Sequence, residues 1–415
     1  MSTVVDSGPD CGTDPVVMHG YHEDANTLTS ELTAEFSKQF PNVSWELRTD
    51  TFANLMTTVP RLLAGDNPPD IVRVTNLVEL QKDGLLLNLD PYFDAYGWDE
   101  FPASQIDWMR VSDDGTRGEG HLYGFGQGFS LTGVYYNREL AEEVGMTEVP
   151  KTLAEFDDVI ARAKAAGIQP IIQHNASDSG GGLAFPLQQL MASYGPATPI
   201  NDWVYGMAGA TIETPPNVDA AKHLKQWLDA GYFTSDLNAL QYADAQARFG
   251  QGEALFTFNG DWQNGGFDND LPGGVGFFLF PPMDEGDPHA AMSAPALYTI
   301  PANAPNPDCA AFYANWVATN PMARQIEVDI AGSNPGGPTS LPLPTVAADS
   351  VTNETLAGGP VVADDNGFMD FIANATQSIF FGTWTPELQK LAADKQTPEG
   401  LLQAVQAAYE EELGR

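Results

Sequence analysis

The sequence predicts an α/β fold divided between two domains. Its 415 residues, 43% of them hydrophobic, are ample for large cores and too many for a single compact one. Between residues 16 and 74, the spacing of apolar residues switches repeatedly between the strand and the helix period. A second block of this kind begins near residue 150. Such alternation favours a largely parallel sheet that gathers ligands at the carboxyl ends of its strands.

The first block predicts a β-α-β-α-β run. Its first helix carries apolar residues at every fourth position, on one face: Leu28, Leu32, Phe36 and Phe40. Pro41 stops this helix. The other predicted elements are strands at 16–18 and 43–47, a helix at 52–63 with Gly65 as its C-cap, and a strand from residue 71.

The second block begins with a helix that Thr152 and Glu155 cap as a capping box and Gly167 ends. A strand at 168–172, a helix closed by Gly231, a helix around Phe249 and a buried strand at 254–258 follow. The last of these runs into the polar turn Asn259-Gly260-Asp261-Trp262. Farther on we expect a helix capped by Asp308, a loop and crossover at 331–367, and helices at 386–393 and 398–413, the last capped by Thr397.

The charge excludes several partners. Only 18 Lys and Arg stand against 56 Asp and Glu, which gives a formal net charge of -38. Nucleic acid is excluded as a partner because phosphate neutralisation needs clustered basic residues. Anionic membranes would repel the chain, and no apolar stretch is long enough to span a bilayer. High net charge keeps an exported protein soluble in a salty or wall-associated setting.

The first residues and the two cysteines bear on the cellular compartment in which the protein works. The first residues lack the basic start and apolar core of a signal peptide, and we expect an extracellular or cell-surface protein whose export signal is absent from this sequence. Cys11 and Cys309 are the only two cysteines. One disulfide and two free thiols are equally compatible with the sequence.

Motifs for catalysis are scarce. The sequence has no GxSxG, HExxH or Walker A string, and its cysteines and histidines lack the spacing of a zinc site, so we expect no cofactor and no metal. Three turns instead combine polar and aromatic residues at strand ends: 21–24, 127–130 and 259–262. Carboxylates and amides suit sugar hydroxyls, and an aromatic plate suits their C–H faces.

These features occur in a chain that resembles the extracellular solute-binding proteins of ABC importers, in the carbohydrate-binding group that includes maltose-binding protein. The resemblance runs nearly end to end. It rests on the order and spacing of six segments: FSKQFPNVSWEL (36–47), LLAGDNPPDIV (62–72), GVYYNRELAEEVG (133–145), VPKTLAEFDDVI (149–160), FGQGEALFTFNGDW (249–262) and KQTPEGLLQAV (395–405).

The resemblance implies a two-lobe periplasmic-binding-protein-like fold with a hinge and an inter-lobe cleft that holds the ligand. Lobe 1 would comprise residues 12–128 and 293–345, and lobe 2 residues 131–290 and 346–415. The hinge crossings would lie near 128–131, 290–293 and 345. The chain would act as a monomer without enzymatic activity.

The resemblance also implies the site residues. Trp262 matches a stacking tryptophan, and Phe381 falls where another stacking aromatic lies. Ser130 stands where maltose binders have a carboxylate, which makes maltose a poor fit. Phe185, Trp203 and Trp384 are alternatives for the cleft. The other candidates, for contacts with sugar hydroxyls, are His22, Glu23, Asp24, Asn76, Gln127 and Asp261.

The sequence therefore predicts a protein that captures a mono- or oligosaccharide and delivers it to the membrane permease of an ABC importer. Two other classes remain open. Paired carboxylates could serve an extracellular glycoside hydrolase. Carboxylates could also hold a polyamine or another cationic solute, with an affinity that collapses in salt.

Overall fold

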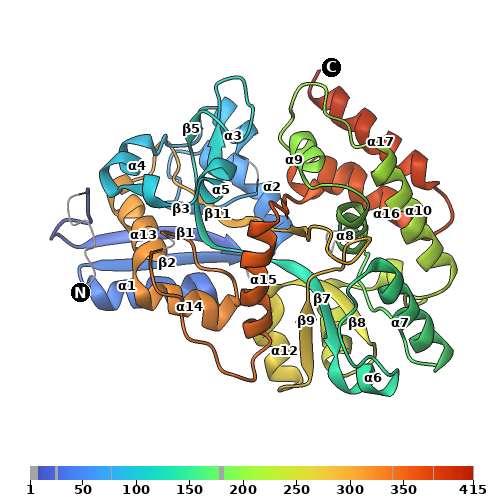
Figure 1. Ribbon diagram of the computed structural model, residues 1–415. Coiled ribbons are helices and arrows are strands. Elements are labelled where there is room, and N and C mark those ends of the chain that lie inside the picture. Colours follow the sequence, from blue (N-terminus) through green and yellow to red (C-terminus); the bar gives the residue numbers. More distant parts are fainter. Residues whose placement is uncertain are drawn as a thin grey trace. The chain divides into compact units, whose positions relative to one another are not determined.

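The computed structural model divides the chain into two compact units, drawn in Figure 1. It describes residues 8–23, 27–75, 77–176, 182–338, 340–376 and 378–414. Unit 1 comprises residues 1–130 and 294–346, and unit 2 comprises residues 131–293 and 347–415. Each unit thus combines two separate stretches of the chain.

Unit 1 is built on a five-stranded sheet in the order β2-β1-β3-β11-β6. β1 lies parallel to β2 and β3, and β11 runs antiparallel to β3 and β6. Its larger elements are β1 (Val16–Glu23), α1 (Leu28–Gln39), β2 (Val43–Asp50), α2 (Phe52–Leu63), β3 (Ile71–Arg73), β6 (Phe125–Phe129), β11 (Pro295–Thr299), α13 (Pro307–Thr319) and α14 (Pro321–Ala331). The β-α-β-α-β run and its parallel pairing, predicted from the apolar spacing, are confirmed.

Smaller elements connect β3 to β6. They are α3 (Val78–Lys82), α4 (Asp90–Tyr96), η1 (Trp98–Glu100), α5 (Ala103–Ile106), η2 (Asp107–Met109), β4 (Arg110–Val111) and β5 (His121–Leu122). α1, α13 and α14 pack together, as Figure 1 shows. Phe36 of α1 is fully buried there, with Tyr313 and Trp316 of α13 at ring-centroid distances of 5.3 and 5.2 Å.

Unit 2 has a smaller sheet in the order β8-β7-β9, and both of its strand pairs are antiparallel. The expectation of a parallel sheet in this half of the chain is therefore wrong. Residues 168–172, predicted as a strand, form only isolated bridges at Ile171, to Phe233 and Phe256. The sequence misled here because a short buried apolar run has the same pattern with or without ladder partners.

The helices α6, α8 and α15 of unit 2 pack on strands of this sheet. Its elements up to β10 are β7 (Thr132–Asn137), α6 (Arg138–Glu143), α7 (Leu153–Ala165), α8 (Ala184–Tyr194), α9 (Thr198–Val204), α10 (Pro215–Asp229), η3 (Leu237–Ala239), α11 (Tyr242–Gly250), β8 (Phe256–Gly260), η4 (Asp261–Gln263), α12 (Asn264–Asp270), β9 (Val275–Phe278) and β10 (Ala291–Met292). The later elements are α15 (Thr352–Asp364), β12 (Phe368–Met369), η5 (Ile372–Asn374), the π-helix η6 (Ser378–Trp384), α16 (Thr385–Ala392) and α17 (Pro398–Glu412).

Local chemistry sets several helix ends as predicted. The Thr152 hydroxyl accepts from the Glu155 backbone nitrogen at the start of α7, and the Thr397 hydroxyl accepts from Gly400 at the start of α17. Gly167 and Gly231 have φ of 79° and 68°. These positive values explain why glycine follows α7 and α10.

Three predictions about helix ends and loops are wrong. Ala64 rather than Gly65 caps α2, with its backbone nitrogen bonded to Pro60. Asp308 does not cap α13. It lies in the first turn, where its carboxylate accepts a hydrogen bond from the Tyr92 hydroxyl at 2.7 Å. The stretch 331–367, expected to be loop, contains α15.

Cys11 and Cys309 form a disulfide within unit 1, which resolves the two possibilities left by the sequence. The bond joins the segment ahead of β1 to the first turn of α13 across 298 residues of chain. Among the helices of the described residues, none is long and apolar enough to cross a membrane.

Candidate functional site

Three aromatic side chains from separate segments meet on unit 2, and we call Phe185, Trp262 and Phe371 the aromatic platform. Trp262 belongs to η4, directly after β8, while Phe185 lies in the first turn of α8 and Phe371 immediately precedes η5. The ring centroid of Trp262 lies 6.1 Å from that of Phe185 and 6.4 Å from that of Phe371. All three side chains are only partly buried. Partly exposed rings held by one another form a rigid apolar surface.

The indole of Trp262 is also hydrogen-bonded within unit 2. Its Nε1 donates to the hydroxyl of Tyr242, the first residue of α11, at 2.9 Å. The Tyr242 hydroxyl lies 3.1 Å from Oε1 of Gln263 and 3.3 Å from Oδ1 of Asn259, to either of which it can donate. The polar edge of the indole is therefore turned towards the protein.

Asp261, next to Trp262, is fully buried. Its Oδ2 accepts from the backbone nitrogen of Leu131 at 2.9 Å, and its own backbone nitrogen donates to the Leu131 carbonyl. The carboxylate thus ties η4 to the residue before β7. Its predicted contact with sugar hydroxyls stays a prediction.

His22 and Glu23 lie at the end of β1 in unit 1. His22 is 4% exposed, with Nε2 3.1 Å from the Thr49 hydroxyl and Nδ1 2.9 Å from the Glu23 carbonyl. Glu23 forms an ion pair with Arg73, with 2.9 Å between Oε1 and Nε. Both side chains therefore have partners inside unit 1, and their roles in ligand binding stay predictions.

Gln127 is 1% exposed within the core of unit 1. Its Oε1 accepts from the Thr29 hydroxyl at 3.0 Å, and its Nε2 donates to the Tyr313 hydroxyl at 3.1 Å. Ser130, also in unit 1, donates from Oγ to the Ala294 carbonyl and accepts from its backbone nitrogen, at 3.0 and 3.1 Å. These contacts use half of the hydrogen-bonding capacity of the Gln127 amide, and the donor and one of the two lone pairs of the Ser130 hydroxyl. The roles of both side chains towards a ligand remain predictions.

Phe381 lies on the π-helix η6 of unit 2, half-buried beside Phe380 with 4.3 Å between ring centroids. π-helical turns are frequent at functional sites.

Asp24 and Asn76, the remaining candidates, lie outside the described residues. The structure thus brings together Trp262 and Phe185. Trp203 and Trp384 are 1% and 0% exposed in the hydrophobic core of unit 2, and their roles as alternatives stay predictions.

Two residues of this region were missed by sequence reasoning. Phe371 follows a two-residue strand, and Tyr242 opens an amphipathic helix, so neither lies in a conspicuous turn. The only sequence signal for Phe371 is an aromatic residue next to the acidic Asp370 at a strand end. Tyr242 has none, because its importance comes from a hydrogen bond to a residue 20 positions away.

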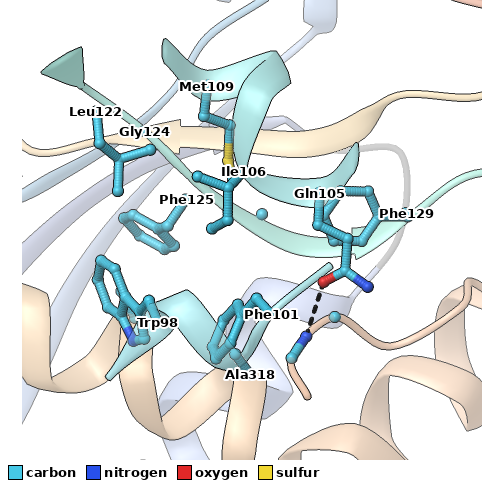
Figure 2. A pocket seen from close by; sticks show the side chains of 14 residues that line it. Trp98, Phe101, Gln105, Ile106, Met109, Leu122, Gly124, Phe125, Phe129 and Ala318 are labelled. Atoms are coloured by element: carbon cyan, nitrogen blue, oxygen red, sulfur yellow. Dashed lines mark hydrogen bonds between the residues drawn. The ribbon is translucent and has the colours of Figure 1, made fainter. Parts of the chain in front are cut away.

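A small apolar pocket lies within unit 1, away from these residues in the chain (Figure 2). Trp98, Phe101, Phe125 and Phe129 contribute rings to its lining. The amide of Gln105 is at one side, where its Oε1 accepts from the Gly337 backbone nitrogen at 3.0 Å. The free space is about 20 Å³, enough for about one water molecule. A pocket of this size does not hold a sugar.

Within the described residues, no group of three or more His, Cys, Asp or Glu side chains is placed to hold a metal ion. Several pKa shifts belong to fully buried groups of the cores. Burial raises the pKa of Tyr135 in unit 2 and of Tyr313 and Glu327 in unit 1. None of the three is part of the aromatic platform.

Comparison with known structures gives matches over nearly the whole chain. A chitin oligosaccharide binding protein is 21% identical with a TM-score of 0.78, over 97% of this chain and 100% of the other. RafE in complex with raffinose is 19% identical with a TM-score of 0.73, over 95% and 99%. Maltose-bound MalE3 of T. maritima is 16% identical with a TM-score of 0.75, over 96% and 99%. At these identities the likeness establishes the fold, and the predicted periplasmic-binding-protein-like α/β fold is confirmed.

No curated protein matches the chain. The model of one protein family does, over residues 19–324. The match covers most of the chain and includes five of the six segments on which the sequence resemblance rests, those between residues 36 and 262. The chain therefore belongs to the bacterial extracellular solute-binding protein family.

Proposed function

We propose that this protein captures a mono- or oligosaccharide and delivers it to the membrane permease of an ABC importer. The aromatic platform is the observation that carries the proposal. Sugars bind through apolar C–H faces that stack on partly exposed aromatic rings, and Trp262 presents such a ring beside Phe185 and Phe371, whose own ring centroids lie 6.1 Å apart. Enclosure of the ligand between two lobes, with the boundaries predicted from the sequence, is part of the proposal.

Family membership and the compartment support the same function. The family consists of substrate-binding proteins rather than enzymes. That this chain catalyses no reaction and acts as a monomer belongs to the proposal. The Cys11–Cys309 disulfide fits an exported protein, because such bonds persist in oxidising compartments. The structural neighbours named for chitin oligosaccharide, raffinose and maltose make oligosaccharides the first ligands to test.

The test is a titration calorimetry screen of the whole chain against mono- and oligosaccharides, amino acids and polyamines, followed by product analysis. A sugar that binds and is recovered intact supports the proposal, and it should raise the melting temperature because it binds only the folded state. Hydrolysed sugar would instead indicate a glycoside hydrolase. Binding of polyamines alone, lost in salt, would indicate a cation-binding protein.

Trp262→Ala should weaken sugar binding by about 1–4 kcal/mol, as expected for an aromatic anchor. Tyr232→Ala is the matched control. Tyr232 is a half-buried aromatic of unit 2 whose backbone carbonyl accepts from Ile171, and Ile171 bridges to Phe256, the first residue of β8. Trp262, in contrast, follows the end of that strand. Unchanged affinity in Trp262→Ala, or an equal loss in Tyr232→Ala, would remove the platform from the binding site.

A further inference from the structure

The ring of Trp262 lies directly over Gly260. A Cβ atom added to Gly260 would fall on the ring carbons Cζ3 and Cη2 of Trp262, far inside van der Waals contact. Gly260 has φ of -113° and ψ of 167°, an extended conformation open to any residue. Glycine is therefore required here because a side chain would collide with the indole. The backbone conformation alone would allow any residue.

Tyr242 holds the edge of the same ring. Its hydroxyl accepts the indole N–H at 2.9 Å. The Tyr242 ring packs edge to face against His174, with 5.0 Å between centroids and an interplanar angle of 87°. His174 is only 2% exposed. The acceptor for the indole is thus itself held by a buried side chain.

We propose that Gly260 and Tyr242 are positioning residues that preset the Trp262 ring, so that the platform offers a ligand an apolar face while the indole N–H stays bonded within the protein. This inference rests on the proposed function. A preset ring loses little conformational freedom when a ligand arrives, which favours binding. Because the indole N–H already has its acceptor, hydrogen bonds to sugar hydroxyls must come from other residues.

The first test is a double-mutant cycle on the affinity for a sugar found in the screen. Gly260→Ala should lower the affinity about as much as Trp262→Ala, by roughly 5- to 900-fold, because the new methyl displaces the ring. Added to Trp262→Ala, it should have no further effect. Full affinity in Gly260→Ala, or losses that simply multiply in the double variant, would overturn the proposal.

Tyr242→Phe is the milder variant and removes a single oxygen from a side chain that stays in place. It should lower the affinity by about 2- to 10-fold, the size expected for one hydrogen bond. This loss should vanish in the Trp262→Ala background. Tyr232→Phe, which removes the hydroxyl of another half-buried tyrosine of unit 2, should leave the affinity unchanged. A Tyr242→Phe loss that persists without Trp262 would refute positioning.

The second test needs no sugar. In a nitrogen-15 NMR spectrum, the Trp262 indole N–H peak is identified by its absence in Trp262→Phe. In Tyr242→Phe this peak should move and exchange faster with deuterated water, because its acceptor is gone. An unmoved, equally protected peak would overturn the positioning role. If no sugar binds the wild-type protein, the proposed function fails, while this spectrum still decides the positioning of the ring.

Discussion

Asp70 Oδ1 lies 2.7 Å from the backbone nitrogen of Asn306, so the residue before β3 is bonded to the residue before α13. The same carboxylate accepts from the backbone nitrogen of His19 at 2.8 Å and from Nδ2 of Asn306 at 3.2 Å. Asp70 is fully buried. One side chain thereby joins β1, β3 and the chain that returns to unit 1 after residue 294.

We expect Asp70→Ala to lower the free energy of unfolding by about 2–4 kcal/mol, because it removes a buried carboxylate and leaves the backbone N–H groups of His19 and Asn306 without their acceptor. Urea unfolding followed by circular dichroism measures the loss. Asp66→Ala, at an exposed position of the preceding turn, should change stability by less than about 0.5 kcal/mol. Similar values for the two variants would show that the Asp70 bonds contribute nothing particular.

The elements predicted correctly depend on residues close together in the sequence. The caps of α7 and α17 need only a threonine and a backbone nitrogen three positions later. α15 was missed because it contains Gly358, Gly359 and Pro360, which disfavour helix. Packing overrides that preference: a Cβ on Gly358 would meet Leu131 at 3.0 Å and Leu279 at 3.3 Å, so its absence lets the helix approach them.

The candidate site was harder to predict because it also depends on contacts between residues far apart in the sequence. A strand-end polar residue such as Gln127 can face a ligand or a buried partner, and the pattern is the same in both cases. Its partners, Thr29 and Tyr313, are 98 and 186 residues away, so the choice depends on tertiary structure. Trp262 could be predicted as a site residue because it directly follows the end of a strand. Phe371 could not, because only the folded structure brings its ring next to that of Trp262.

The disulfide gives a second prediction. Unfolded, unreduced protein should contain no free thiol, and Cys11→Ser/Cys309→Ser should be less stable by about 2–5 kcal/mol, since the bond restricts the unfolded chain across a long loop. Thiol titration and urea unfolding measure both effects. Reductant should destabilise the wild-type protein and leave the double variant unchanged. Two titratable thiols in the unreduced protein would contradict the structure.

Salt should stabilise the protein. With 56 acidic against 18 basic residues, the folded chain repels itself, and screening this repulsion favours the compact state. The melting temperature should therefore rise between about 0.05 M and about 1 M sodium chloride, as the Debye length falls from above 10 Å to about 3 Å. Sodium sulfate at equal ionic strength separates screening from ion-specific effects. A flat or falling melting temperature in both salts would disprove the effect.

The buried carboxyl of Glu327 should make the free energy of unfolding depend on pH. The carboxyl is fully buried in α14, and neither oxygen has a hydrogen-bond partner among the described residues. Burial raises its pKa well above 4.5, although Arg324 opposes the shift. Below pH 4.5 both states hold the proton. As the pH rises through 4.5 the unfolded state ionises first, so stability is lost until the folded carboxyl ionises too.

Glu327→Gln stays neutral at every pH and should remove this decline. Urea unfolding from about pH 4.5 upward should show the variant gaining stability relative to wild type. Only the wild type has a carboxyl that ionises in the unfolded state while it stays protonated in the folded state. Glu31→Gln, at an exposed position of α1, should run parallel to wild type. Parallel curves for Glu327→Gln as well would mean that this carboxyl titrates alike in both states.

Phe381 and Phe380 provide a matched pair for testing the second predicted stacking residue. Both are half-buried neighbours on η6, with 4.3 Å between their rings, so truncation of either one removes a similar apolar area. If Phe381 stacks on the sugar, Phe381→Ala should weaken binding by about 1–3 kcal/mol in calorimetry, whereas Phe380→Ala should leave affinity nearly unchanged. Equal losses would point to general disruption of the π-helix, and no loss in Phe381→Ala would leave the aromatic platform around Trp262 as the stacking surface.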